Sequence, residues 1–150
     1  MELNVISSAS PYYEKVLSLR NKILRIPLGL NLADEDLSDE ENQVTIIMTR
    51  DEQVIACVML KIIDKDIIKL RQMAVDDAVQ GIGVGATMLR YAENFCINNH
   101  YGLIELHARK PAIGFYQKSG YVIEGNEFEE VGMPHVKMNK HLRHADETNQ

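Results

Sequence analysis

The sequence predicts an α/β fold in which a central sheet packs against helices. Apolar segments with strand character alternate with segments whose apolar residues recur at helical spacing. A set of antiparallel strands in the middle of the chain is followed by a glycine-rich turn that leads into a helix. The 150 residues are 45% hydrophobic and 25% charged, a balance typical of one compact domain. We expect this domain to cover residues 1–142, with a polar C-terminal tail over residues 143–150.

The first third of the chain predicts a strand, a helix and an acidic segment. Leu3–Ile6 has strand character, and Ser10–Pro11 predicts a helix start because a capping hydroxyl precedes a proline. Pro27 and Gly29 are expected to end that helix. Asp34–Glu41 predicts a loop or a short exposed helix with solvated charges. The alternative is a rim that attracts a cationic substrate.

The middle of the chain predicts an antiparallel meander. Its strands are Val44–Met48, the continuously apolar Val54–Leu60, and Ile67–Val75. Polar turns are expected at Arg50–Gln53 and Asp64–Asp66.

The last part of the chain alternates helices and strands. A helix should follow Gly85, with one apolar stripe made by Gly85, Met88, Leu89, Ala92, Phe95 and Cys96. The further predicted elements are a strand at Leu103–Ala108, a short helix opened by Pro111 and closed by Gly120, and strands at Tyr121–Ile123 and Val136–Leu142.

Charge and composition argue against several classes of protein. A net charge of −6 argues against nucleic acid as the main partner, because phosphate backbones select basic surfaces. No apolar run is long enough to span a bilayer, and the N-terminus carries no signal-peptide pattern, so we expect a cytoplasmic protein without a membrane partner. Cys57 and Cys96 are expected to be buried, reduced thiols. No Cys/His group has metal-ligand spacing, so no metal site is expected.

Gly81, Gly83 and Gly85 lie where a strand gives way to a helix. Glycine permits positive φ and close approach of another group to the backbone. The first N–H groups of a helix lack internal partners, and the helix dipole adds partial positive charge there. This combination predicts an anion site of the kind that holds phosphate. A tight turn packed on the sheet is the structural alternative.

Two other phosphate-binding patterns fit less well. The Walker pattern fails because no Lys-Ser or Lys-Thr follows the glycines. The segment Gly81–Ala86 satisfies G-x-G-x-x-G/A, and Glu105 lies at a suitable distance downstream for a dinucleotide fold. However, the polar stretch Asp76–Gln80 separates the predicted strand from the first glycine. The upstream chain is an antiparallel meander and not a βαβ unit. Too little sequence follows to form the second half of a dinucleotide-binding fold.

At this loop the sequence resembles the GCN5-related N-acetyltransferase (GNAT) superfamily. Gln80, Gly83 and Gly85 match the signature Q/R-x-x-G-x-G/A, and Ala112–Tyr121 resembles the family's A-x-x-F/L-Y-x-K-x-G-F/Y segment. The order of elements matches from Leu3 to Leu142. The stretches Leu106–Arg109 and Gly132–Met138 resemble a subgroup of small bacterial-type acetyltransferases.

The resemblance implies a fold, a cosubstrate and a set of binding residues. The fold would be a mixed central sheet of about six to seven strands with helices on both faces, splayed at the acyl-CoA site. The donor would be acetyl-CoA, with its pyrophosphate on the glycine loop, its pantetheine arm along the strand ending Met73–Val75, and its thioester carbonyl polarised by the amide near Met73. The implied binding residues are Met73, Ala74, Val75, Gln80, Gly81, Ile82, Gly83, Val84, Gly85, Ala86, Arg109, Phe115 and Tyr116.

The resemblance also implies a direct transfer without a covalent enzyme intermediate. Tyr116 would donate a proton to the departing thiolate, although its helical spacing with Ala112 and Phe115 also fits a core aromatic. Many relatives have an asparagine three residues before the alanine of the second motif, where this chain has Arg109. Arg109 could instead reach a phosphate or shape the acceptor pocket.

An attacking amine must lose a proton to a base or through an ordered water path. Glu105 and His107 alternate onto one face of a predicted strand, and histidine suits this role because its side chain titrates near neutral pH. We take His107 as the first candidate and Glu105 as the second. His135 is a third histidine in the final part of the fold, and a hydrogen-bonded structural role is the alternative for each.

The predicted activity is acetyl-CoA-dependent acetylation of a primary amine on a small molecule or a protein. A non-catalytic acyl-CoA-binding or sensor module of the same fold is the main alternative, and a dinucleotide oxidoreductase is the third. The sequence does not identify the acceptor, decide between N- and O-acylation, or show whether the chain forms a homodimer.

Overall fold

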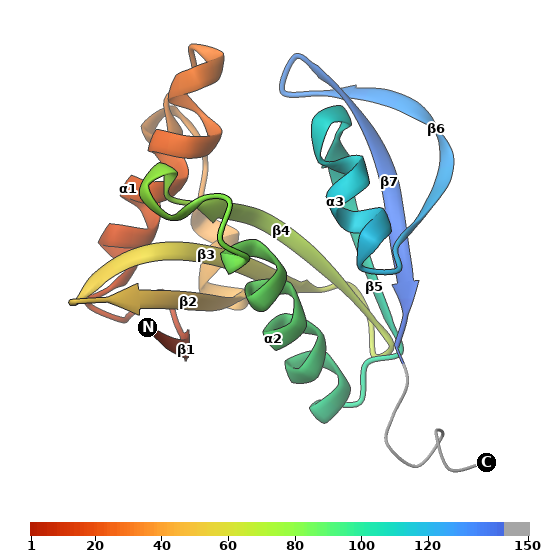
Figure 1. Ribbon diagram of the computed structural model, residues 1–150, viewed down its shortest axis with the longest axis horizontal. Helices are drawn as coiled ribbons and strands as arrows, with labels where there is room; N and C mark the ends of the chain where they lie inside the picture. Colours follow the sequence, from red (N-terminus) through yellow and green to blue (C-terminus); the bar gives the residue numbers. More distant parts are fainter. Residues whose placement is uncertain (143–150) are drawn as a thin grey trace. The chain divides into compact units, whose positions relative to one another are not determined.

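The computed structural model describes residues 1–142, and these form a mixed α/β structure (Figure 1). Within that range seven strands form one sheet in the order β1-β2-β3-β4-β5-β7-β6, which confirms the predicted mixed sheet of six to seven strands. The predicted polar tail, residues 143–150, lies outside the described residues. The helices and strands are β1 (Glu2–Ile6), α1 (Tyr13–Leu24), β2 (Val44–Arg50), β3 (Gln53–Ile62), β4 (Ile67–Val75), α2 (Val84–Asn98), β5 (Leu103–Arg109), α3 (Ile113–Lys118), β6 (Val122–Glu130) and β7 (Met133–His141).

The chain divides into two compact units. The first contains Met1–Lys61 and Arg71–Ala92, and the second contains Ile62–Leu70 and the residues from Glu93 onward. Strand β4 and helix α2 each contribute residues to both units. The single domain expected over residues 1–142 and the splayed strands expected at the acyl-CoA site both remain predictions.

In the first unit, β1, β2 and β3 pair antiparallel in sequence order, and β2 and β3 are two strands of the predicted meander. Strand β4, the third strand of that prediction, is the neighbour of β3 in the sheet. Glu2 pairs with Thr49 at one end of the β1–β2 ladder, and Val44 pairs with Leu60 in β2–β3. The β2–β3 turn is formed by Asp51–Glu52, both at positive φ (51° and 65°), as expected for a tight hairpin. Strand β3 is buried from Val54 to Leu60, as its unbroken apolar run predicts.

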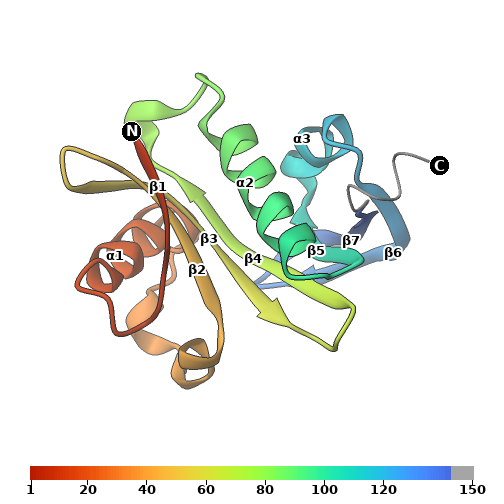
Figure 2. The same cartoon turned by 90° about the horizontal axis from the view of Figure 1, so that it is seen from below.

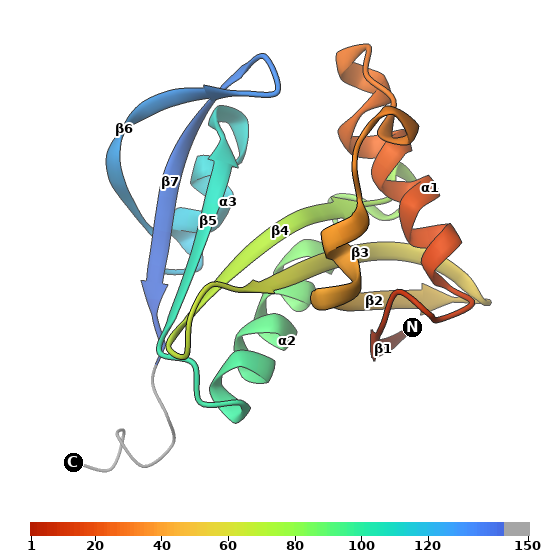
Figure 3. The ribbon, with the colours of Figure 1, turned by 180° about the vertical axis from the view of Figure 1, so that it is seen from behind.

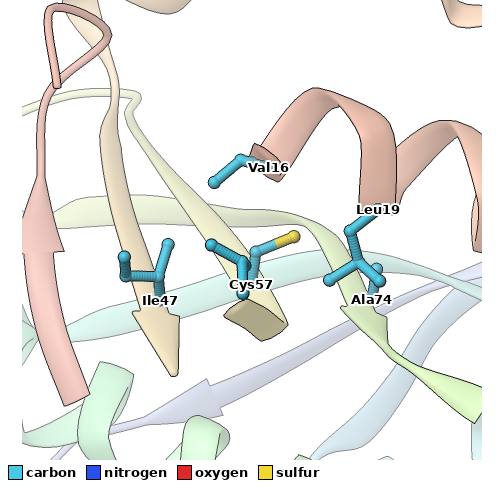
Figure 4. Close-up of a cluster of buried hydrophobic side chains, with 6 residues drawn as sticks. Val16, Leu19, Ile47, Cys57 and Ala74 are labelled. Atoms are coloured by element: carbon cyan, nitrogen blue, oxygen red, sulfur yellow. The ribbon is translucent and has the colours of Figure 1, made fainter. Parts of the chain in front are cut away.

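A compact hydrophobic cluster joins α1 to the strands of the first unit. Val16 and Leu19 project from α1 toward Ile47 of β2 and Cys57 of β3, and Ala74 of β4 completes the labelled group (Figure 4). These side chains are almost completely buried, so their apolar surface is removed from water. Helix α1 and the first turns of α2 lie on opposite sides of these strands (Figure 2), which confirms the prediction of helices on both faces.

Helix α1 begins later than the sequence predicts. The Ser10 hydroxyl accepts a hydrogen bond from the Tyr12 backbone N–H at 3.1 Å, and the Ser10 carbonyl accepts one from Tyr13 N–H at 3.0 Å. Ser10–Pro11 therefore forms a turn before the helix, because the serine caps this turn rather than the first turn of α1. At the other end the helix stops at Leu24, just before a 3₁₀ turn that contains Pro27, with Gly29 at a φ of 74°.

The second unit is a small sheet that carries α3. Ile67–Leu70 of β4 pairs in parallel with Leu103–Leu106 of β5, and β7 lies antiparallel between β5 and β6. Helix α3 lies beside β5 and β7 in both views (Figures 1 and 3). These pairings bring residues from the last third of the chain alongside β5.

The last hairpin is longer than predicted. Strand β6 extends from Val122 to Glu130, where the sequence predicts a strand only at Tyr121–Ile123, and β7 begins at Met133 rather than Val136. The residues of β6 are mostly exposed at this edge of the sheet, so they lack the apolar pattern that would have revealed the strand. Within residues 1–142, no helix combines the length and the apolar character needed to cross a lipid bilayer.

Candidate functional site

The glycine loop follows the end of β4 in the first unit. A short 3₁₀ turn covers Asp77–Val79, and the Asp76 carboxylate caps it by accepting a hydrogen bond from Ala78 N–H at 3.0 Å. The Gln80 side chain donates to the Val75 carbonyl at 3.0 Å and fixes the start of the loop against the strand end. The loop is thus anchored at its entry by two local polar side chains.

Two of the three glycines need their conformational freedom. Gly81 and Gly83 adopt φ values of 82° and 86°, whereas Gly85 lies in the first turn of α2. A Cβ atom added at Gly81 or Gly83 would meet no atom within 4 Å, so backbone conformation, and not crowding by the protein, requires glycine there. Ile82 between them is 66% exposed. The space beside the loop backbone can therefore accept a ligand.

The start of α2 supplies hydrogen-bond donors next to that space. Thr87 N–H donates to the Gly83 carbonyl at 3.1 Å, the first α-helical bond at this end. The N–H groups of Val84, Gly85 and Ala86 precede that bond and have no acceptor one turn earlier in the helix. With the helix dipole, they form a centre of partial positive charge that can hold a phosphate-type anion. The geometry fits the predicted anion site.

The end of β4 contains a kink that the sequence does not reveal. Gln72 has a φ of 54°, the left-handed conformation that is unusual for a residue with a side chain. Its side-chain oxygen accepts from Arg25 Nη2 at 3.3 Å, and Cys57 Sγ lies 3.7 Å from its carbonyl oxygen. A kink in a strand changes the direction of the backbone groups that follow. Those groups belong to Met73–Val75, the segment predicted to bind the pantetheine arm.

Tyr116 lies in a cluster of aromatic rings in the second unit. Its ring meets Phe115 edge-on at a centroid distance of 5.0 Å and Tyr121 at 5.7 Å. Burial raises the pKa of Tyr116 to about 12, so its hydroxyl stays protonated at neutral pH. Tyr116 is only 7% exposed, which agrees with the interpretation of a core aromatic residue. Its protonated hydroxyl is still chemically able to donate a proton.

Tyr121 is held differently from Tyr116. Its hydroxyl donates to Glu93 Oε2 at 2.9 Å, and Lys140 Nζ lies 3.1 Å from the other oxygen of the same carboxylate. Burial and the neighbouring Glu93 charge raise the pKa of Tyr121 well above the usual tyrosine range. This network gives Tyr121 a structural role and provides a natural comparison for Tyr116.

The two predicted base candidates share one face of β5, as their alternation indicated. Ile104, Leu106 and Ala108 are buried on the opposite face. Glu105 is engaged by Lys137 Nζ at 3.3 Å, which holds it as a paired carboxylate. His107 follows two residues later on the same side of the strand and is partly exposed. The ion pair makes Glu105 a weaker candidate for proton abstraction than His107.

His107 belongs to a cluster that the sequence does not predict. Its Nδ1 lies 3.0 Å from Glu130 Oε1, and its ring meets Phe128 edge-on at a centroid distance of 5.0 Å. His135 Nε2 lies 3.7 Å from the second Glu130 oxygen. Burial alone would raise the pKa of Glu130, but the hydrogen bond with His107 and favourable electrostatic interactions with His107, His135 and Lys69 lower it. Glu130 is therefore a carboxylate at neutral pH.

Most carboxylates of the acidic segment are exposed, as the expectation of solvated charge requires, but Glu40 is an exception. Glu40 is buried and accepts hydrogen bonds from Arg20 and Tyr13, while Glu35 pairs with Arg25 at 2.5 Å. These contacts lie inside the first unit and fix the segment to α1. The sequence could not show this, because each partner comes from a distant turn of the chain. The alternative of an attracting rim is left to the segment's exposed residues, such as Asp36.

The predicted site residues fall into one group in each unit. Met73–Val75 and Gln80–Ala86 lie in the first unit, the former at the end of β4 and the latter in the loop and the start of α2. The second group is in the second unit and consists of Glu105, His107, Arg109, Phe115 and Tyr116. Arg109 ends β5 and pairs in register with His135 of β7. Sequence reasoning missed Gln72 and Glu130, which no motif distinguishes from ordinary polar residues.

Comparison with known proteins adds a family-level match. A sequence model of the acetyltransferase (GNAT) domain matches residues 30–142 of the chain. The uncharacterized protein YyaT of Bacillus subtilis is 34% identical over 74 residues, which are 49% of this chain and 50% of that protein. The match thus spans about half the length of this relative.

Solved structures share the fold at low sequence identity. An acyl-CoA N-acyltransferase from Pseudomonas aeruginosa superimposes with a TM-score of 0.82 at 15% identity, over 93% of this chain and 99% of that one. A GNAT family acetyltransferase from Elizabethkingia anophelis, solved with acetyl-CoA bound, gives a TM-score of 0.69 at 16% identity, over 94% of this chain and 97% of that one.

Proposed function

Because this chain belongs to the acetyltransferase (GNAT) family, we propose that it transfers an acetyl group from acetyl-CoA to a primary amine. The observation that carries the proposal is the glycine loop, where two positive-φ glycines precede the start of α2 and leave open space beside the backbone. A structural neighbour holds acetyl-CoA, which supports the choice of donor. The acceptor in this proposal is a small-molecule or protein amine.

The loop fits the diphosphate of coenzyme A. Backbone N–H groups between Gly81 and Ala86 would hold the phosphate oxygens, with the partial positive charge of the helix start favouring the anion. Gln80 is occupied with the Val75 carbonyl and holds the loop in place. Beyond the kink at Gln72, the backbone of Met73–Val75 would pair with the pantetheine arm, and the amide near Met73 would donate to the thioester oxygen.

The remaining groups would move protons. When bound, the donor thioester supplies the acetyl group, and the attacking nitrogen must be neutral. His107 would take the proton from the amine, because Glu105 is paired with Lys137. Tyr116, which remains protonated at neutral pH, would donate to the departing sulfur. Arg109 and Phe115 would complete the donor site.

The proposal also covers surroundings and assembly. Cys57 and Cys96 are both free and buried, as expected, and free thiols suit a reducing compartment such as the cytoplasm. Neither nucleic acid nor a membrane has a part in the proposed reaction. The proposal is compatible with a homodimer. Measuring the molecular mass in solution by sedimentation in an analytical ultracentrifuge would decide whether the chain pairs with itself.

Calorimetry with acetyl-CoA, followed by a coenzyme A release assay over a panel of amines, tests the proposal. Saturable binding and amine-dependent release are expected. Binding without release for any amine would favour a non-catalytic acyl-CoA sensor of the same fold. Absence of binding to folded protein would overturn the proposal, and binding of NAD alone would favour an oxidoreductase.

A further inference from the structure

Glu130 and His107 form a carboxylate–imidazole pair whose hydrogen-bond chemistry selects one form of the histidine. The Glu130 carboxylate can only accept hydrogen bonds, and its Oε1 lies 3.0 Å from His107 Nδ1. The proton of a neutral His107 ring must therefore lie on Nδ1 to make this bond. Nε2 then carries the lone pair and is the basic nitrogen of the ring.

The surroundings of the pair fix its geometry. Phe128 lies two residues before Glu130 on β6 and contacts the His107 ring edge-on. The same Phe128 ring stacks on His135 at a centroid distance of 6.1 Å and an interplanar angle of 27°. His107 is thus held by an aromatic ring and a carboxylate from one strand, which limits rotation about its side-chain bonds.

His135 does not compete for the same hydrogen bond. Its Nδ1 lies 2.9 Å from the Met133 carbonyl oxygen, so this nitrogen is the donor, and the ring is buried. Its Nε2 is 3.7 Å from Glu130 Oε2, beyond hydrogen-bond distance. Glu130 is therefore bonded to His107 and only electrostatically coupled to His135.

We propose that Glu130 is a positioning residue that holds His107 with Nδ1 protonated and Nε2 available to accept the proton of the acceptor amine. This inference rests on the proposed function, which makes His107 the candidate base, and it names a residue and an atom that the family match does not supply. The pattern follows the general rule that a base is oriented by a third group bonded to its other nitrogen. The other charged groups around His107 are Glu105 and Arg109 on β5, Lys137 and His135 on β7, Glu124 on β6, and Lys69 on β4.

Nitrogen-15 NMR of the histidine rings tests the tautomer on the protein alone, without donor or acceptor. At a pH where the ring is neutral, His107 should show a protonated Nδ1 and an unprotonated Nε2. In Glu130→Ala the balance should shift toward the Nε2–H form that free histidine prefers. A matched Glu129→Ala variant, changed at the exposed neighbour on the same strand, should keep the wild-type tautomer.

Steady-state kinetics test the positioning role on the same variants. Glu130→Ala should lower kcat by roughly 10- to 100-fold, part of the contribution of a general base, with an unchanged KM for acetyl-CoA. Glu129→Ala should retain wild-type kcat. A wild-type His107 protonated on Nε2, a tautomer unmoved by Glu130→Ala, or full turnover in that variant would each overturn the inference. Because the NMR measurement needs no turnover, an incorrect tautomer prediction can be distinguished from an incorrect proposed function.

Discussion

Arg20 and Glu40 form a bidentate ion pair inside the first unit, with Nη1–Oε1 and Nη2–Oε2 distances of 2.8 Å each. Their side chains are only 1% and 5% exposed. Tyr13 donates to the same carboxylate, and Met59 Sδ lies 3.3 Å from Arg20 Nη1. Each charge in this setting depends on the other, because an unpaired buried charge is costly. The pair ties the acidic segment to α1.

Arg20→Met is predicted to destabilise the protein by about 3–5 kcal/mol, because it leaves the buried Glu40 carboxylate without its partner. Adding Glu40→Leu should recover more than half of this loss, since an apolar pair of similar size often replaces a buried ion pair without cost. Urea unfolding of the single and double variants measures the coupling. Strictly additive losses would show that the two side chains do not act as a pair.

Stability is predicted to fall in acid. Burial would raise the pKa of Glu40, but hydrogen bonds from Arg20 and Tyr13 lower it below its ordinary value of 4.5. The Arg25 hydrogen bond likewise lowers the pKa of Glu35. A carboxyl whose pKa is depressed by folding stabilises the protein above its unfolded pKa, and this contribution is lost as pH falls through the folded value.

The free energy of unfolding should therefore be nearly level above about pH 5 and decline below about pH 4.5. Urea melts across this range measure the decline. Glu35→Gln should flatten part of it, because the amide does not titrate. A stability that rises on acidification would contradict the role assigned to these carboxylates.

Strand and helix positions were predictable where burial imposes a pattern. β3 is buried on both faces, so its run from Val54 to Leu60 is apolar without interruption, and α2 repeats its buried residues at helical spacing. β6 was underestimated because an exposed edge strand needs no apolar pattern. The start of α1 was misplaced because Ser10 satisfies backbone groups in a preceding turn instead.

Site residues were predictable only where local chemistry fixes the residue type. Gly81 and Gly83 are glycine because of their positive φ, a requirement that a sequence motif records. Glu40 and Glu130 act through partners 20 and 23 residues away, which no local pattern records. Gln72 adopts a positive φ without being glycine, so its kink left no signature either.

Gly81→Ala and Gly83→Ala are predicted to weaken acetyl-CoA binding as well as stability. Each forces an alanine into positive φ, which costs about 1–2 kcal/mol. Gly29→Ala is a matched control, because Gly29 has a φ of 74° and equally open surroundings but lies outside the loop.

All three variants should lose similar stability in thermal melts, whereas calorimetry should show weaker binding only for the two loop variants. Equal affinity in Gly29→Ala and the loop variants would argue against a donor site at this loop.

Tyr116→Phe is predicted to lower kcat by roughly 10²-fold or more while leaving acetyl-CoA affinity nearly unchanged, because only the proton donor is removed. Tyr121→Phe should instead lower the stability of the protein with little effect on kcat. It loses the hydrogen bond to Glu93 and with it about 1–3 kcal/mol of stability. With a pKa of about 12, Tyr116 should leave no inflection in the wild-type pH–rate profile below about pH 10. Full turnover in Tyr116→Phe would assign the ring to the core alone.

His107→Asn and Glu105→Gln are predicted to separate the two base candidates. Both residues lie on one face of β5, so each variant alters the same surface without touching the buried face. His107→Asn should lower kcat by about 10²-fold or more and remove the acid limb of the pH–rate profile, because the group that accepts the proton is gone. Glu105→Gln should keep that limb, because Glu105 is paired with Lys137 and takes no part in the proposed proton transfer.

The double variant completes the test. If it matches His107→Asn in both kcat and profile, His107 alone carries the proton transfer. If instead Glu105→Gln removes the acid limb and His107→Asn keeps it, the assignment is reversed. A double variant with a wild-type profile excludes both residues and points to an ordered water path as the base.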